Sequence, residues 1–391
     1  MPQRYSEVLG GEPEAVTVPT TLDEGAAIVA AASATGKAII PWGGGTGQEY
    51  GYPPRRTDIL LDLSAMNRVL AHEPGDLTVT VEPGVTLAQL QKTLSAHHQF
   101  LPLDPPHADR ATMGGIIATN AYGPSRVGHG TGRDWLIGLT LVDPQGRIIK
   151  GGGKVVKNVT GYDLPKLHIG ALGTLGVIVE ATFKVAPKPE ASHALLFRLT
   201  GSGREAVAAF LAALTSRRIA PSLCLLNETG EGERHLVLVW SGPREVVEGE
   251  CEAAAQLAEM TGLTAPQRLD SDFTVAEPQA EVLVRLEVPP ADTWATHSAL
   301  AAAFAIDTLQ TSPFVGVVEA ATSIEAATTL LRWAAERKVR VSVLHAPLTF
   351  RQQEGVPLWH PLPSAFPMMR RLKETLDPNA TLNPGRFVGR L

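Results

Sequence analysis

Cysteine is nearly absent from this sequence, which has only Cys224 and Cys251 among its 391 residues. Two thiols do not hold an iron–sulfur cluster, which usually takes four thiolates. Apolar or helix-like surroundings predict that both are buried and free. Aromatic residues are also scarce, at 5%, and the net charge is −6. The composition therefore argues against base-stacking platforms and against nucleic-acid binding as a main task.

Long apolar runs are missing as well. No segment reaches the roughly 18 apolar residues of a membrane-spanning helix. The N-terminal stretch, MPQRYSEVLGGEPEA, lacks the apolar core of a signal peptide. We therefore expect a cytoplasmic protein without a transmembrane segment. Any association with the inner face of the cell membrane would be peripheral and would depend on partner proteins.

Glycine, by contrast, is abundant in the first half of the chain. The first glycine-rich loop, PWGGGTG at 41–47, directly follows the apolar residues 38–40. Successive residues without a Cβ let their N–H groups converge on one point, and such a nest binds phosphate. The dinucleotide fingerprint GxGxxG fails, because Gln48 or Tyr50 stands where its last glycine belongs, and no Gly-Lys-Ser/Thr occurs. The loop therefore predicts a diphosphate site, but one that is built on neither of these two motifs.

Local sequence signals predict an α+β protein of two domains. A capping box at 21–24 begins a helix that Gly36 ends, and Thr86 caps a second helix. The triplet Pro187-Lys188-Pro189 interrupts the pattern and predicts a domain boundary. Strands are expected at 38–41, 58–63, 77–81, 135–142, 147–150 and 177–185, then at 193–199, 222–226, 235–240, 280–288, 313–319 and 339–344. Further helices are expected at 203–217, 243–261, 292–305, 323–337 and 367–376.

Four more glycine-bearing segments follow the first in a fixed order. They are TMGG at 112–115, GTGRD at 130–134, KNVTGYD at 157–163 and GALGTLG at 170–176, which runs into VIV. With PLDPPH at 102–107 and LNPGR at 382–386, they resemble the FAD-binding domain of the vanillyl-alcohol oxidase / p-cresol methylhydroxylase flavoprotein superfamily. Within it, the chain looks most like the smaller FAD-binding subunit of glycolate oxidase.

This resemblance implies a fold and a function. Residues 1–188 would form a two-subdomain FAD-binding domain, 189–345 an α+β cap domain with an antiparallel sheet, and 346–391 a segment that returns to the flavin. The implied protein is the FAD-binding subunit of a glycolate oxidase complex, which oxidises a 2-hydroxy acid to a 2-oxo acid. Its implied partners are a larger FAD subunit and an iron–sulfur subunit.

The resemblance also implies the residues that contact FAD. The first loop would wrap the pyrophosphate, the 112–115 segment would begin a helix behind it, and the C-terminal segment would meet the isoalloxazine. The implied contacts are Pro41, Trp42, Gly43, Gly44, Gly45, Thr46, Gly47, Pro105, Thr112, Gly114, Gly115, Asn120, Gly123, Gly130, Thr131, Arg133, Asp134, Gly173, Gly176, Val177, Ile178, Asn383 and Arg386. Lys157 and Tyr162 would stabilise a loop over the cofactor or face a partner.

Three departures from the family pattern qualify these expectations. Relatives with covalent flavin carry a histidine in or beside the first glycine loop, and this chain has none, so we expect non-covalent FAD. Leu172 stands where many relatives have Glu or Gln, which would weaken cofactor affinity or leave a drier pocket. The His-rich, metal-capable motif of larger members is missing, and we expect no metal.

Catalysis needs a base for the hydroxyl proton and a cation for the substrate carboxylate. His345 is the candidate base and Arg351 the candidate carboxylate clamp. The competing interpretations are a surface or packing histidine and a solvated loop arginine. Two other functions remain open: a stand-alone FAD-dependent dehydrogenase for another 2-hydroxy acid or an alcohol, and a structural or electron-relay flavin subunit without chemistry of its own.

One expectation concerns the first loop directly. Replacing Gly44 by Val should abolish FAD retention and leave the fold largely intact, because a Cβ would keep the backbone away from the phosphates.

Overall fold

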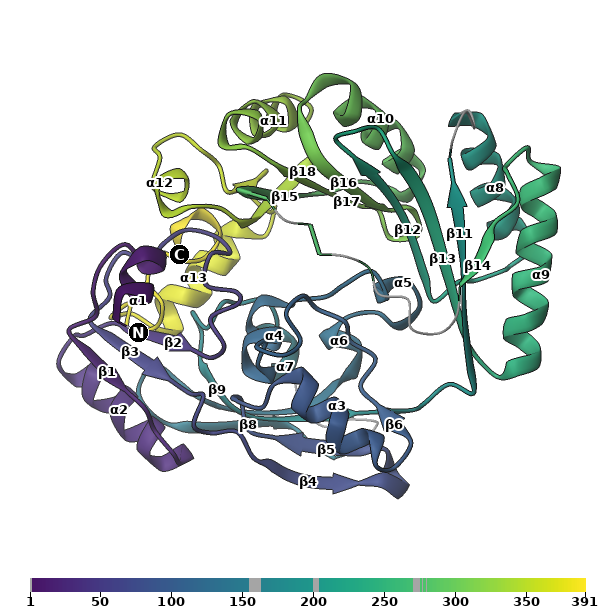
Figure 1. The fold of residues 1–391 in the computed structure, drawn as a ribbon. Coiled ribbons are helices and arrows are strands. Elements are labelled where there is room, and N and C mark those ends of the chain that lie inside the picture. The colour runs from purple at the N-terminus through teal and green to yellow at the C-terminus, as the bar shows by residue number, and fades with distance from the viewer. Residues whose placement is uncertain (1, 155–162, 200–203, 270–274, 276, 279) are drawn as a thin grey trace. The chain divides into compact units, whose positions relative to one another are not determined.

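The structure is a computed structural model of the 391-residue chain. It describes all residues except 1, 155–162, 200–203, 270–274, 276 and 279. The described chain divides into two compact units (Figure 1). Unit 1 comprises residues 1–123, 131–188 and 344–391, and unit 2 comprises 124–130 and 189–343. Lys157 and Tyr162 lie outside the described residues.

Unit 1 begins with a small parallel sheet that leads into the first glycine loop. Its strand order is β1 (Ala15–Thr17), β3 (Ile59–Asp62), β2 (Ile39–Trp42). Helix α2 (Leu22–Ala34) begins where the Thr21 hydroxyl accepts a hydrogen bond from the Glu24 N–H, as the capping box predicts. Its apolar side packs with β2 and β3 in one core cluster. The strand therefore delivers the loop at 43–47 from a rigid base.

A second, antiparallel sheet forms the rest of the unit 1 scaffold. Its order is β4 (Val69–Glu73), β5 (Thr78–Val81), β9 (Val177–Lys184), β7 (Leu136–Val142), β8 (Ile148–Gly152). Helices α3 (Leu87–Ser95) and α4 (Met113–Thr119) pack on it through Leu87, Leu90, Leu94 and Met113 in a second core cluster. The strands expected at 135–142 and 147–150 correspond to β7 and β8, which pair antiparallel on either side of residues 143–147.

Shorter elements complete unit 1. They are α1 (Pro2–Leu9), β6 (Gln99–Phe100) paired with β10 (Ala186–Pro187), α6 (Gly132–Trp135), α7 (Leu164–His168), α12 (Leu348–Arg351), β19 (Trp359–His360) and α13 (Phe366–Leu376). The chain after α13 returns to β2: the Ile39 N–H donates to the Thr381 carbonyl over 2.6 Å, and the Asn383 N–H donates to the Ile39 carbonyl over 2.9 Å. The C-terminal segment thus lies beside the strand that enters the glycine loop.

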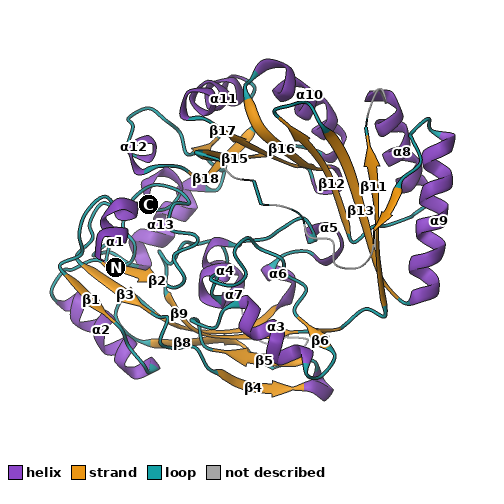
Figure 2. Ribbon diagram, viewed as in Figure 1, coloured by secondary structure: helices purple, strands orange, loops and turns teal. Residues whose placement is uncertain are grey.

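Unit 2 is an antiparallel sheet with helices on one face (Figure 2). Its strands run in the order β14 (Gln267–Leu269), β11 (Ala191–Arg198), β13 (Arg234–Gly242), β12 (Leu223–Thr229), β16 (Ile306–Ser312), β17 (Val317–Thr322), β15 (Val282–Glu287), β18 (Arg340–His345). The helices are α8 (Arg204–Ser216), α9 (Arg244–Met260), α10 (Thr293–Ala303) and α11 (Ile324–Glu336), while α5 (Arg126–His129) comes from the 124–130 segment. The α+β class and the antiparallel sheet are confirmed.

One strand of this sheet differs from the sequence prediction. A strand was expected at 313–319, but Pro313–Val315 forms a short 3-10 turn, and strands β16 and β17 lie on either side of it. Gly316 has a φ of 72°, and a Cβ there would collide with the Val288 carbonyl. The turn therefore depends on glycine at position 316, because only glycine readily adopts this positive φ, which does not occur in an extended strand.

The two cysteines are buried and free, as predicted. Cys224 on β12 and Cys251 on α9 lie in the same apolar cluster of unit 2, and burial raises the pKa of both thiols. Among the described residues, no helix is long and apolar enough to cross a membrane.

A buried histidine makes unit 1 sensitive to acid. His168, at the end of α7, is 7% exposed, and burial lowers its pKa to about 4 from 6.5. The unfolded chain takes up this proton near pH 6.5 and the folded chain only near pH 4. The free energy of unfolding should therefore fall as the pH drops from 6.5 toward 4, by about 3 kcal/mol in all.

Urea unfolding at pH 7 and pH 5 measures this loss. The His168→Asn variant should lose less stability between the two pH values than the wild type does. His98→Asn is the matched control, because His98 is exposed, and it should keep the wild-type pH dependence. An unchanged dependence in His168→Asn would contradict the assignment.

Candidate functional site

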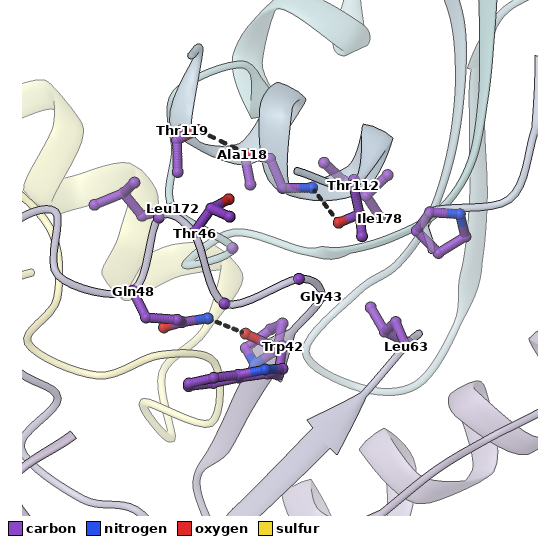
Figure 3. Close-up of a pocket in the computed structure, with 18 of the residues that line it drawn as sticks. Trp42, Gly43, Thr46, Gln48, Leu63, Thr112, Ala118, Thr119, Leu172 and Ile178 are labelled. Atoms are coloured by element: carbon purple, nitrogen blue, oxygen red, sulfur yellow. Dashed lines mark hydrogen bonds between the residues drawn. The ribbon is translucent and has the colours of Figure 1, made fainter. Parts of the chain in front are cut away.

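A pocket lies within unit 1 (Figure 3). Segments that are distant in sequence converge on it, chiefly the loop after β2, helix α4, the loop before β9 with the start of that strand, and the C-terminal return. Its walls are Pro41, Trp42, Gly43, Gly44, Gly45, Thr46, Gly47, Gln48, Leu63, Pro83, Thr112, Gly114, Gly115, Ala118, Thr119, Leu172, Gly173, Gly176, Ile178, Asn383 and Arg386.

The loop from Gly43 to Gly47 packs against α4 closely enough to require glycine. A Cβ on Gly47 would lie 2.6 Å from the Thr119 methyl carbon, and a Cβ on Gly43 would collide with the Thr112 hydroxyl. Gly45 has a φ of 75°, where glycine is strongly favoured. The loop therefore runs along the pocket wall with its backbone exposed to the cavity and no side chains in between except Thr46.

Backbone donors of this loop are unused. Within the part of the chain that the structure describes, no acceptor is hydrogen-bonded by the N–H groups of residues 43–47. We call these five groups the N–H nest. Successive free N–H groups of a glycine loop can bind an anion, and the five residues that carry them line the pocket. A diphosphate such as that of FAD is chemically compatible with the nest.

The N-terminus of α4 borders the pocket, and its first N–H groups have partners within the protein. The N–H groups of Met113 and Gly114 already donate to the Val85 and Pro83 carbonyls, over 2.8 and 2.9 Å. The Gly115 N–H donates to the Thr112 hydroxyl over 3.4 Å, and the Thr119 hydroxyl donates to the Gly115 carbonyl over 2.8 Å (Figure 3). This helix end adds its positive dipole to the pocket, while the free donors belong to the nest.

The expectation for Gly44→Val is wrong in one respect. A Cβ on Gly44 points at the Arg110 carbonyl and would collide with that backbone oxygen. Backbone atoms cannot rotate away as a flexible side chain can. The substitution would therefore displace the 105–112 connection, and the loss of cofactor would come with damage to the fold.

The C-terminal return places two polar side chains in the wall. Asn383, at a φ of 45°, donates its amide to the Leu172 carbonyl over 2.6 Å. Arg386 is 2% exposed and donates to the Gln48 amide oxygen over 3.1 Å and to the Tyr50 carbonyl over 3.3 Å. Asn383 Oδ1 and Arg386 Nε are buried without a partner among the described residues. These two atoms can bind a polar ligand.

The position of Arg386 is unfavourable for a positive charge, because the side chain is buried. Burial, together with the neighbouring charge of Arg351, lowers the pKa of its guanidinium to about 9. A buried cation is costly unless a negative group compensates it. An anionic or electron-rich ligand in the pocket would provide that compensation.

A buried ion pair holds the return segment in place. Lys373 on α13 pairs with Asp377 and also donates to the Thr174 and Leu382 carbonyls over 2.7 and 2.9 Å. Asp377 accepts the N–H groups of Thr381 and Leu382 over 2.8 and 2.9 Å. Burial lowers the pKa of Lys373, and the Asp377 charge opposes that shift. This network ties α13, the loop before β9 and the return segment together.

Fifteen of the sequence-predicted contacts line this one pocket. They are Pro41, Trp42, Gly43, Gly44, Gly45, Thr46, Gly47, Thr112, Gly114, Gly115, Gly173, Gly176, Ile178, Asn383 and Arg386. The eight others do not line it: Pro105, Asn120, Gly123, Gly130, Thr131, Arg133, Asp134 and Val177. Their contact with FAD stays a prediction.

Five of these eight residues have identifiable local roles. Asn120 ends α4 with a φ of 50°. Gly123 donates its N–H to the Asp104 carboxylate over 3.2 Å. Thr131 and Asp134 form a capping box that begins α6, and Gly130 belongs to unit 2. Val177 packs in the core beneath α2.

Six wall residues were not predicted from the sequence as contacts: Gln48, Leu63, Pro83, Ala118, Thr119 and Leu172. Ala118 and Thr119 lie four residues after Gly114 and Gly115, one helical turn on, so helix periodicity could have found them. Gln48 directly follows the nest and donates to the Pro41 carbonyl over 3.0 Å. Leu63 and Pro83 carry no local signal.

The two candidate catalytic residues lie outside the pocket walls. His345 ends β18, and its Nδ1 lies 2.7 Å from Glu49 Oε2. Arg351 is 1% exposed on α12 and donates to the Ala346 and Val8 carbonyls over 2.9 and 2.7 Å. Burial lowers its pKa to about 10. The interpretation of Arg351 as a solvated loop residue is wrong, and its role as a carboxylate clamp stays a prediction.

The ion pair of Lys373 predicts a large stability effect. Lys373→Met leaves the Asp377 carboxylate buried without its charge partner, which should lower the free energy of unfolding by roughly 3–5 kcal/mol. Lys92→Met, at an exposed position of α3, is the control and should change little. Urea unfolding measures both variants. A loss under about 1 kcal/mol in Lys373→Met would contradict the role given to this pair.

Comparison with known proteins agrees with this geometry. Residues 13–152 match the family model of the FAD binding domain. The chain is 38% identical over 184 residues to glycolate oxidase subunit GlcD of Bacillus subtilis, covering 47% of this chain and 39% of that one. It is 38% identical over 136 residues to glycolate oxidase subunit GlcE of Escherichia coli, covering 34% and 39%. The chain thus spans about two fifths of the length of these two relatives.

One relative matches along nearly the whole chain. D-lactate dehydrogenase of Archaeoglobus fulgidus is 28% identical over 96% of this chain and 91% of its own. Among solved structures, p-cresol methylhydroxylase with substrate bound has a TM-score of 0.72 at 16% identity, covering 95% of this chain and 88% of that one. Alkyldihydroxyacetonephosphate synthase has a TM-score of 0.70 at 18% identity, and the match covers 94% of this chain and 75% of the synthase chain. These two structures establish the fold.

The matched domain, the shared fold and a pocket with an unsatisfied N–H nest agree with one another. This chain is an FAD-binding flavoprotein with the vanillyl-alcohol oxidase / p-cresol methylhydroxylase fold.

Proposed function

We propose that this protein is an FAD-dependent oxidoreductase that oxidises the CH–OH group of a small 2-hydroxy acid to a 2-oxo acid. The observation that carries the proposal is the N–H nest at residues 43–47, open to a pocket in a matched FAD binding domain. The substrate class is supported by relatives whose names include glycolate oxidase subunit, D-lactate dehydrogenase and D-2-hydroxyglutarate dehydrogenase.

In this proposal the chain holds FAD without a covalent bond. The nest would bind the pyrophosphate, and Asn383 and Arg386 would meet the flavin ring with the two buried polar atoms that lack partners. Leu172 adds an apolar side chain to the wall, which keeps that part of the pocket dry. Bound FAD supplies the hydride acceptor. Removing the hydroxyl proton falls to the protein, and His345 is the candidate base.

A second candidate is the glycolate oxidase subunit role, with a larger FAD subunit and an iron–sulfur subunit as partners. The matches to GlcD and GlcE support it. The match to the archaeal D-lactate dehydrogenase along both whole chains supports the stand-alone enzyme instead. Cys224 and Cys251 are buried free thiols, so electrons leaving the flavin would pass to another molecule. Co-purification of the tagged chain at its native level separates the two roles.

The reaction itself is tested by anaerobic spectroscopy. The purified chain should show the visible absorption of oxidised flavin, and this absorption should bleach with at least one of glycolate, D-lactate and D-2-hydroxyglutarate. Flavin that stays oxidised with all three would favour the non-catalytic subunit. A protein that carries no flavin and takes up no added FAD would contradict the proposal.

The pocket assignment is tested by filling it. Ala118 lines the cavity from α4 (Figure 3), and Ala118→Leu should place a larger side chain there. We expect FAD affinity to fall at least about tenfold, or ~1.4 kcal/mol. Ala88→Leu, at an exposed position of the neighbouring helix α3, is the matched control. Fluorescence titration of the apoproteins with FAD measures both. Equal affinities would place the cofactor elsewhere.

A further inference from the structure

A carboxylate–imidazole pair lies immediately beyond the pocket wall. Glu49 follows the wall residue Gln48, and its Oε2 lies 2.7 Å from Nδ1 of His345. The two side chains come from distant parts of the sequence but both belong to unit 1. The His345 side chain is 43% exposed, so a small molecule can reach the imidazole.

The fold fixes the Glu49 backbone from both sides. Before it, the Gln48 amide donates to the Pro41 carbonyl and accepts from Arg386. After it, the Tyr50 carbonyl accepts from Arg386, and the Tyr50 ring packs on Trp359 with centroids 5.4 Å apart. The same buried arginine that lines the pocket therefore anchors both neighbours of Glu49. Such a carboxylate is held more firmly than one in a mobile surface loop.

The His345 end of the pair is anchored by a second buried arginine. Arg351 donates from Nε to the carbonyl of Ala346, the residue next to His345, over 2.9 Å. The charge of Glu49 acts on Arg351 and opposes the lowering of its pKa by burial. The Glu49 carboxylate thus interacts electrostatically with a buried cation, Arg351, and pairs with the His345 imidazole.

We propose that Glu49 is a positioning residue that keeps the proton of neutral His345 on Nδ1 and leaves Nε2 free to accept the substrate's hydroxyl proton. A hydrogen bond from Nδ1–H to a carboxylate selects this tautomer and stabilises the imidazolium that forms. This inference rests on the proposed function and assigns its proton-transfer group.

The step balances with FAD as the oxidant. The carbon that carries the hydroxyl loses its hydrogen with both bonding electrons, as a hydride to FAD, and the O–H bond breaks as its proton moves to His345 Nε2. The electrons of that bond form the new C=O bond. The 2-hydroxy acid is oxidised, FAD is reduced, and the positive charge gained by His345 faces the Glu49 carboxylate.

Rapid anaerobic flavin reduction by a 2-hydroxy acid tests the role. His345→Gln should slow the reduction rate about 100-fold or more, and Glu49→Gln about 10- to 100-fold, because general base catalysis contributes at these levels. Flavin content should be unchanged, and the substrate concentration for half-maximal rate should move less than about threefold, since neither group is assigned to binding. Glu354→Gln, at an exposed glutamate of the same unit, should match the wild type.

The double variant separates this role from an independent one. If Glu49 acts only through His345, Glu49→Gln combined with His345→Gln should be no slower than His345→Gln alone. A further slowing in the double variant would overturn the proposal, as would a Glu49→Gln rate equal to the wild type.

A spectroscopic readout tests the pair without turnover. In protein labelled with ¹⁵N-histidine, the nitrogen shifts of neutral His345 should report the Nδ1–H tautomer, and Glu49→Gln should lose that preference. An unchanged tautomer in Glu49→Gln would overturn the positioning role and leave the proposed function intact. A wild-type flavin that no 2-hydroxy acid reduces would overturn the proposed function and, with it, the proton-transfer role.

Discussion

The close approach of the 43–47 backbone to helix α4 is the constraint on which the site depends. Side chains at Gly43 or Gly47 would collide with Thr112 or Thr119, so only glycine allows this spacing. Among the described residues, the five N–H groups of 43–47 have no acceptor, and all five residues line the pocket. Backbone donors without acceptors are unfavourable unless a ligand supplies hydrogen bonds and negative charge. The shape of this pocket wall therefore follows from a requirement of the backbone.

The rest of unit 1 fixes the positions of this loop and of the opposite wall of the pocket. Strand β2 brings the loop from a buried sheet, and the C-terminal return pairs with the same strand. The Lys373–Asp377 pair joins the return to the loop before β9. Arg386 then reaches from the return to both neighbours of Glu49. One short segment near the C-terminus therefore completes the pocket wall and holds both neighbours of Glu49, a member of the proposed proton-transfer pair.

The sequence predicted these features unevenly, for physical reasons. Glycine clusters and caps are local requirements, so the nest, the Thr21 and Thr86 caps and the Asn383–Arg386 return could be predicted from the order of residues alone. The apolar wall residues Leu63 and Pro83 could not, because a leucine or proline in a pocket looks like any other in a core. Strand β16 was missed because the proline–glycine turn after it was taken for part of a strand. The burial of Arg351 and the Glu49–His345 contact are tertiary, and no local pattern encodes them.

We assign the N–H nest to the pyrophosphate of FAD. Titration of the apoprotein with FAD and, separately, with riboflavin, which has the same ring but lacks the pyrophosphate and the adenosine, tests this assignment. We expect riboflavin to bind at least about a hundredfold more weakly, or ~2.7 kcal/mol, because it leaves the nest unsatisfied. Equal affinities for the two would show that the ring alone determines binding and would contradict the role given to residues 43–47.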